Sequence, residues 1–103
     1  MFKIVFYVPV EGCEKVKQAM FEAGAGRVGL YECCSWQTVG QGQFRGLQGA
    51  NPAIGQVDQI ETVEEYCVEM VCDERYIKAA IQALLQSHPY ETPAYSYWKI
   101  QTA

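Results

Sequence analysis

The pattern of apolar and polar positions predicts four strands. Phe2–Pro9 is apolar at nearly every position and rich in valine, isoleucine and aromatic residues, which is typical of a central strand covered on both faces. Alternation of apolar and polar positions predicts strands at Leu30–Val39, where two glycines then interrupt the pattern, and at Ile60–Cys72. The aromatic segment Ala94–Gln101 predicts the last strand.

Two segments repeat their apolar residues with the spacing of a helix. Glu11–Ala23 has apolar side chains at i, i+3, i+4 and i+7, and Gly24 follows it as a C-cap. Glu74–Ser87 has a similar apolar stripe, and Asp73 precedes it as an N-cap. The order of elements is therefore βαββαβ, with a long hairpin between the two helices.

This order predicts an α+β fold of the ferredoxin-like type, with an antiparallel four-stranded sheet and both helices on one face. At 103 residues the chain has the size of a single domain, expected to span 1–103. Half of the residues are hydrophobic, and the sheet face opposite the helices has no chain left to cover it. Copies of the same molecule are the natural cover, so we expect a homo-oligomer.

Charge and cysteine content narrow the classes of partner and compartment. The net charge is −4 and the basic residues are scattered, which argues against nucleic acid as a partner. The sequence has neither the layout of a signal peptide nor an apolar run near the roughly 20 residues that span a bilayer. Five cysteines, an odd number without framework spacing, suit a reducing compartment. We therefore expect a cytoplasmic protein that binds no membrane.

Eight of the nine glycines lie between Gly24 and Gly55, and the first three match the dinucleotide-binding pattern GxGxxG. In a true dinucleotide site a strand leads into the motif and a helix follows it. Here a helix precedes Gly24 and a strand is expected afterwards, so the backbone N–H groups of a helix start are missing. The glycines are therefore interpreted as a helix stop and a tight entry into the sheet.

The segment after the second helix holds the only histidine, followed by two prolines. A structural interpretation places the His88 imidazole at a helix end, where it complements the helix dipole. A functional interpretation makes His88 and Glu91 a polar pair beside aromatic walls, able to bind a cation or a small ligand. The structural interpretation is the favoured one, and the sequence shows no triad, nucleophile elbow or pair of flanked carboxylates for catalysis.

Several motifs in order carry a resemblance to a known family. They are Gly26–Tyr31, Cys34–Trp36, Gly40–Arg45, Gly49–Gly55 and His88–Tyr95. Together they closely resemble the domain inserted in YqfO-type, or Nif-three-like, proteins, here as a stand-alone version. That inserted domain is similar in fold to the CutA and PII proteins, which assemble as trimers. The resemblance thus favours a CutA/PII-like trimer, with a dimer left open.

The chain also departs from the family pattern. Gly46 stands where proline is frequent, and Thr92 and Ser96 stand where acids are common. The family domains that surround the inserted one carry a two-metal site drawing on several histidines, whereas this chain has one. We therefore do not expect this chain to have the metal-dependent hydrolase activity that the family resemblance would suggest.

Three hypotheses for function follow. The first is a non-catalytic oligomeric module that binds a small ligand, an ion or a protein partner in clefts between subunits. The second is a divalent metal-ion binding protein that uses His88 and Glu91, and the third is an enzyme whose active site is completed between subunits. The ligand is unknown. The candidate ligand-binding residues are His88, Tyr90, Glu91, Tyr95, Trp36, Phe44, Arg45 and Asn51.

Overall fold

The computed structural model describes residues 1–102. Its elements follow the order βαββαβ, so the predicted ferredoxin-like α+β fold is confirmed. Short 3-10 turns lead into both helices. In chain order the elements are β1 (Phe2–Pro9), η1 (Val10–Gly12), α1 (Cys13–Glu22), β2 (Trp36–Arg45), β3 (Ile60–Cys72), η2 (Glu74–Tyr76), α2 (Ile77–Ser87) and β4 (Tyr95–Lys99).

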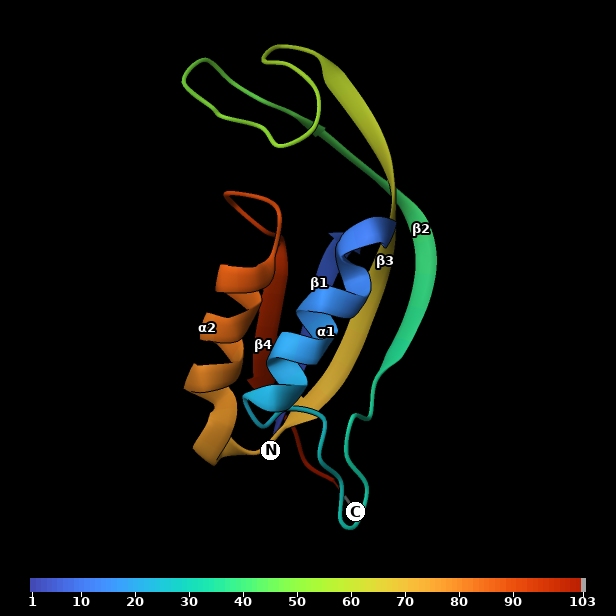
Figure 1. Ribbon diagram of the computed structural model, residues 1–103, viewed down its shortest axis with the longest axis vertical. Helices are drawn as coiled ribbons and strands as arrows, with labels where there is room; N and C mark the ends of the chain where they lie inside the picture. The colour runs from blue at the N-terminus through green and yellow to red at the C-terminus, as the bar shows by residue number, and fades with distance from the viewer. Residues whose placement is uncertain (103) are drawn as a thin grey trace.

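The four strands form one antiparallel sheet in the order β2-β3-β1-β4. Both helices cover the same face of this sheet, as Figure 1 shows. Strand β1 lies between β3 and β4, in the central position that its continuous apolar sequence predicts. The two helix crossovers thereby bring the chain ends into neighbouring parts of the sheet.

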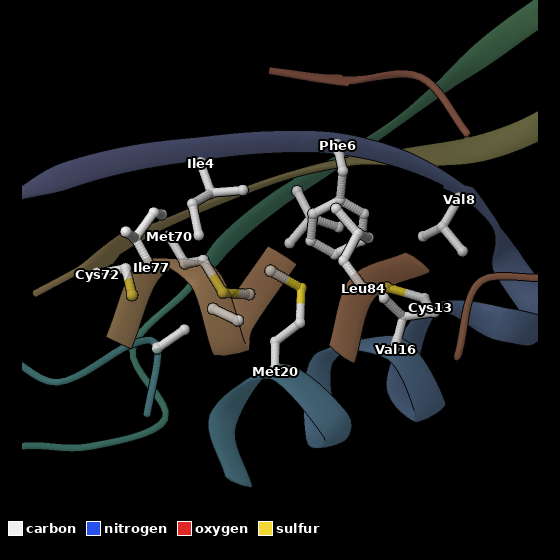
Figure 2. Packing of buried hydrophobic residues seen from close by; sticks show 13 residues of the cluster. Ile4, Phe6, Val8, Cys13, Val16, Met20, Met70, Cys72, Ile77 and Leu84 are labelled. Atoms are coloured by element: carbon white, nitrogen blue, oxygen red, sulfur yellow. The ribbon is translucent and has the colours of Figure 1, made fainter. Parts of the chain in front are cut away.

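The core lies between the sheet and the two helices (Figure 2). Strands β1 and β3 each supply alternate residues, and each helix supplies one apolar stripe, because strand side chains alternate with period two and helical ones with period 3.6. The buried residues are Ile4, Phe6, Val8, Cys13, Val16, Met20, Ala25, Val68, Met70, Cys72, Ile77, Ala80 and Leu84.

The two edge strands contribute little to this core. Within residues 1–102, none of the buried hydrophobic residues lies in β2 or β4. Large side chains on these strands face solvent instead: Trp36 is 59% exposed and Trp98 is 47% exposed. The face of the sheet opposite the helices is open, as expected from the sequence.

Strands β2 and β3 continue beyond the end of β1 as a two-stranded hairpin. Pro9 pairs with Glu65, so the first part of β3, from Ile60 to Glu64, pairs only with β2. The hairpin bends over that end of the molecule toward the turn that follows α2 (Figure 1). It gives the molecule an elongated shape of 46 × 24 × 23 Å.

One predicted strand is wrong at its start. The sequence predicts a strand over Leu30–Val39, whereas β2 begins at Trp36. Its end is also different, because β2 continues through Gly40 and Gly42 to Arg45. Glycine weakens a strand but does not end it when the residues before and after the glycine stay paired with the neighbouring strand, as they do here with β3.

The residues before Trp36 form a tight turn instead of a strand. Val28 and Tyr31 exchange two backbone hydrogen bonds of 2.9 Å, and Gly29 between them has a φ of +57°. Cys33 has a φ of +58°, in the left-handed region, so the backbone is not extended at this position before the strand starts. Alternating apolar residues resemble a strand in sequence, but these side chains are exposed.

The predicted C-terminal ends of the helices are confirmed to within one residue, whereas the two predicted starts lie in the 3-10 turns η1 and η2 that precede α1 and α2. Helix α1 is followed by Gly24, whose φ of +110° is the left-handed conformation expected of a C-cap glycine. Asp73 accepts a hydrogen bond of 2.9 Å from the backbone N–H of Arg75, as an N-cap does. This bond also lowers the pKa of Asp73. Over the described part of the chain, neither helix has the length and apolar character needed to cross a bilayer.

Candidate functional site

A cavity of about 240 Å³ lies between the hairpin and the turn that follows α2. We call it the hairpin pocket. Residues from β1, β2, β3, the loop after β2 and the turn before β4 form its wall, so it joins parts of the chain that are distant in sequence. Its lining residues are Tyr7, Gln43, Phe44, Gly46, Ala50, Pro52, Ala53, Glu65, Tyr90, Glu91, Thr92 and Ala94.

Two contacts hold the hairpin loop against the turn. The backbone N–H of Asn51 donates a hydrogen bond of 3.0 Å to Glu91 Oε1. The rings of Phe44 and Tyr90 lie with their centroids 6.0 Å apart and their planes tilted by 57°. Together these two contacts hold the two walls of the hairpin pocket beside each other.

His88 anchors the turn to the sheet. Its Nδ1 accepts a hydrogen bond of 3.1 Å from the backbone N–H of Tyr90, so the proton of the neutral ring sits on Nε2. Nε2 then donates a bond of 2.7 Å to the backbone oxygen of Tyr7. The residue is 7% exposed, and this burial lowers the pKa of His88. His88 therefore positions Tyr90 beside β1 as an uncharged imidazole.

The hydroxyl of Tyr90 is buried without a hydrogen-bond partner among the described residues. Leaving a buried polar atom unpaired costs about 1 to 3 kcal/mol. Burial raises the pKa of Tyr90, and the carboxylates of Glu65 and Glu11 raise it further. A buried group that still lacks a partner is rare in folded proteins, and one beside a cavity indicates where a ligand or a water molecule can bind.

Glu65 contributes a half-buried carboxylate to the hairpin pocket. Burial raises its pKa. Its carboxylate occupies the space above Gly42 on the neighbouring strand, where any Cβ would collide with Glu65 Oε1. Glycine at position 42 thus makes room for this carboxylate.

The charged side chains among the described lining residues of the hairpin pocket are all acidic. Glu65 and Glu91 both line it, and over the described part of the chain no lysine, arginine or histidine does. Aromatic rings of Tyr7, Phe44 and Tyr90 make up much of the remaining wall. Such an arrangement favours cations and apolar groups over anions.

The structure brings together only some of the residues singled out from sequence. Phe44, Tyr90 and Glu91 line the hairpin pocket, and Asn51 joins it through its bond to Glu91. The other four candidates lie outside the lining. His88 stands behind Tyr90, Arg45 forms an ion pair of 3.8 Å with Asp58, Tyr95 stacks on Tyr97, and Trp36 lies at the opposite end of β2.

Sequence reasoning missed Tyr7 and Glu65 as pocket residues. Both belong to strands that the sequence predicts correctly, and the strand pairing places them on the open face of the sheet. The sequence holds one signal, the alternation of Ile60–Cys72, which separates Glu65 from the apolar side chains of Val68, Met70 and Cys72. The pairing of Glu65 with Gly40 on β2, which leaves space for a long side chain, is seen only in the folded sheet.

Metal binding through His88 and Glu91 stays a prediction. Both ring nitrogens of His88 already have partners within the chain. Among residues 1–102 no group of three or more histidine, cysteine, aspartate or glutamate side chains is placed to hold a metal ion.

The chain matches no protein-family model. Among curated proteins it is similar to those called GTP cyclohydrolase 1 type 2 homolog. The protein of Mycobacterium tuberculosis is 46% identical over 98 residues, which are 95% of this chain and 26% of the relative. That of Bacillus subtilis is 41% identical over 99 residues, again 26% of its length. The chain thus spans about a quarter of the length of these relatives.

Solved structures agree with this relationship. The Bacillus cereus protein related to NIF3 superimposes with a TM-score of 0.83 at 33% identity, over 98% of this chain and 26% of that one. CutA from Xylella fastidiosa superimposes with a TM-score of 0.70 at 20% identity, over 99% of this chain and 85% of that one. The predicted resemblance to the CutA-like domain of the NIF3-related proteins is therefore confirmed, and the second likeness shows a shared fold.

Proposed function

We propose, from the relationship of this chain to one domain of the NIF3-related proteins, that residues 1–103 form a single CutA/PII-like binding module. It acts as a homo-oligomer, a trimer by its fold, and binds a small molecule in the hairpin pocket. The module is not catalytic and works in the cytoplasm, a location that its five free cysteines support. The whole-protein activity named for the relatives is not part of this proposal, because the chain covers 26% of their length.

The observation that carries the proposal is the construction of the hairpin pocket. A loop and a turn that are about 40 residues apart in sequence close one cavity through the bond between Asn51 and Glu91. Tyr90 lines this cavity, and its buried hydroxyl has no partner among residues 1–102, a cost that a bound ligand could offset. Its volume of about 240 Å³ approaches the roughly 300 Å³ at which ligand pockets begin.

Self-association is supported by the edge strands. Most side chains of β2 and all of those of β4 are exposed, although both strands carry aromatic residues. A sheet edge of this kind offers unpaired backbone groups and apolar side chains to another copy. A neighbouring copy would also deepen the hairpin pocket, since its lining residues Tyr7 and Glu91 are still exposed.

A fragment panel tests the proposal. Wild-type protein and the pocket-filling variant Ala53→Trp are compared by thermal shift with cationic, neutral and anionic fragments. We expect at least one fragment to stabilise the wild type and to lose its effect in the variant. A matched variant, Ala79→Trp at an exposed position of helix α2, keeps the response. Equal shifts in wild type and Ala53→Trp for every fragment would contradict binding in the hairpin pocket.

A further inference from the structure

We propose that the ligand of the hairpin pocket is a small primary amine, bound as its ammonium ion between Glu65 and Tyr90, with its apolar body against the hairpin loop. This inference rests on the proposed function and adds the chemical class of the ligand. It uses the charge of the pocket wall, the unpaired hydroxyl and the aromatic side chains.

The Glu65 carboxylate is half-buried, and a cation bound beside it would stabilise its charged form. Within residues 1–102 it takes part in none of the five ion pairs of the structure. Its raised pKa shows the cost of holding it away from water, and a protonated amine would remove that cost by pairing with it.

The Tyr90 hydroxyl supplies the second acceptor. Its oxygen is buried and unpaired among the described residues, and it lies near enough to Glu65 for the carboxylate to raise the pKa of Tyr90. An ammonium group carries three donors. One ammonium placed between these two side chains can therefore donate to both, which a carboxylate or phosphate ligand cannot do.

The rest of the wall fits an apolar body attached to a cation. The ring of Phe44 lies against that of Tyr90, and aromatic faces attract cations within about 6 Å. Ala50, Pro52 and Ala53 supply small apolar side chains from the hairpin loop. A cavity of about 240 Å³ limits this body to a single ring or a short chain.

Two other ligand classes fit less well. An anion would face Glu65 and Glu91 with no basic side chain among the described lining residues. A metal ion needs several ligands in a fixed geometry, and the described residues hold no group of three acidic, histidine or cysteine side chains suited to it.

Calorimetric titration with three probes of equal ring size tests the inference. The probes are 2-phenylethylamine, phenylacetate and 2-phenylethanol, and ZnCl₂ alone is the fourth arm. The variants are Glu65→Gln and Glu64→Gln, which change the same charge on opposite faces of β3, since Glu64 is exposed and outside the pocket lining. Tyr90→Phe removes the hydroxyl and keeps the ring.

We expect 2-phenylethylamine to bind the wild type and Glu64→Gln equally. Its affinity should fall about tenfold or more in Glu65→Gln, the loss of one charged hydrogen bond, and should also fall in Tyr90→Phe. Phenylacetate should show no measurable binding. Glutamine keeps the length and nearly the shape of the Glu65 side chain, and an unchanged melting temperature of Glu65→Gln shows that lost binding in this variant reports the site.

The outcomes separate this inference from the proposed function. If phenylacetate, 2-phenylethanol or Zn²⁺ binds more tightly than the amine, and Ala53→Trp abolishes that binding, the pocket binds ligands but the amine assignment is wrong. The assignment is also wrong if Glu65→Gln and Glu64→Gln bind the amine equally. If no probe binds and the fragment panel gives no shift that Ala53→Trp removes, both proposals fail.

Discussion

The hydroxyl of Tyr90 is the single atom whose environment most clearly departs from the ordinary rules of protein folding. A buried polar atom with no partner among the described residues destabilises the free protein. Such a cost is usual where a site is built for binding and is offset only when the ligand is present. Removing this hydroxyl should therefore change the stability of the ligand-free protein, whatever the ligand is.

Replacing Tyr90 with phenylalanine should raise the free energy of unfolding of the ligand-free protein by about 1 kcal/mol, because the unpaired hydroxyl is removed and the ring packing on Phe44 is kept. Urea denaturation measures the change. Tyr31→Phe is the control, since Tyr31 is 76% exposed and should change stability very little. A loss of stability in Tyr90→Phe would mean that the hydroxyl has a partner in solution.

His88 should make stability depend on pH. Its folded pKa lies below the ordinary value of 6.5 because the ring is buried. As pH falls through 6.5, the unfolded chain takes up a proton that the folded chain does not, so stability is complete above this pH and is lost progressively below it. His88→Gln, whose amide can replace both hydrogen bonds, should lack this loss between pH 6.5 and 5. Melting temperatures measured from pH 6.5 to 5 report this difference. If they fall equally in the wild type and in His88→Gln, His88 is not buried as a neutral ring.

At the scale of elements, the end of α1 depends on Gly24. Its φ is +110°, and a Cβ at this position would lie 2.5 Å from Cγ of Tyr76. Gly29 also has a positive φ but has open space around it. We expect Gly24→Ala to destabilise the protein by at least about 1 kcal/mol more than Gly29→Ala, because its Cβ overlaps Tyr76 and its φ lies further from the left-handed helical region. Equal losses in thermal unfolding would show that the ring moves aside freely.

The sequence predicts most elements because their signals are local. The spacing of apolar residues distinguishes strands from helices, and a capping residue such as Asp73 marks where a helical segment begins. The bounds of β1 and β3 are those predicted. The start of β2 could not be read in this way, since Leu30 and Tyr31 begin the alternating run but lie exposed in the turn at Val28–Tyr31.

The hairpin pocket could be predicted only in part. The loop and the turn were recognisable as segments, but the contribution of Glu65 depends on strand pairing that brings Gly42 beside it. That pairing is a property of the folded sheet.

We expect the whole molecule to self-associate through its open sheet face and edge strands. The protein should have a mass in solution that is a multiple of 11.6 kDa, threefold for a trimer, by light scattering at micromolar concentration. Trp98→Glu, which places a charge on the open sheet face, should lower that mass, whereas Gln86→Glu on exposed helix α2 should not. A monomeric wild type would refute the proposed assembly.

The most direct test of the central claim, that the hairpin pocket is a binding site, is an amide NMR titration of the wild-type protein with 2-phenylethylamine and with the best fragment of the panel. The account predicts that saturable shift changes gather at Phe44, Ala50, Glu65 and Tyr90, which surround the pocket. Shift changes confined to the groove between α2 and β4, lined by Ile81, Leu85 and Tyr97, or no saturable change for either compound, would contradict it.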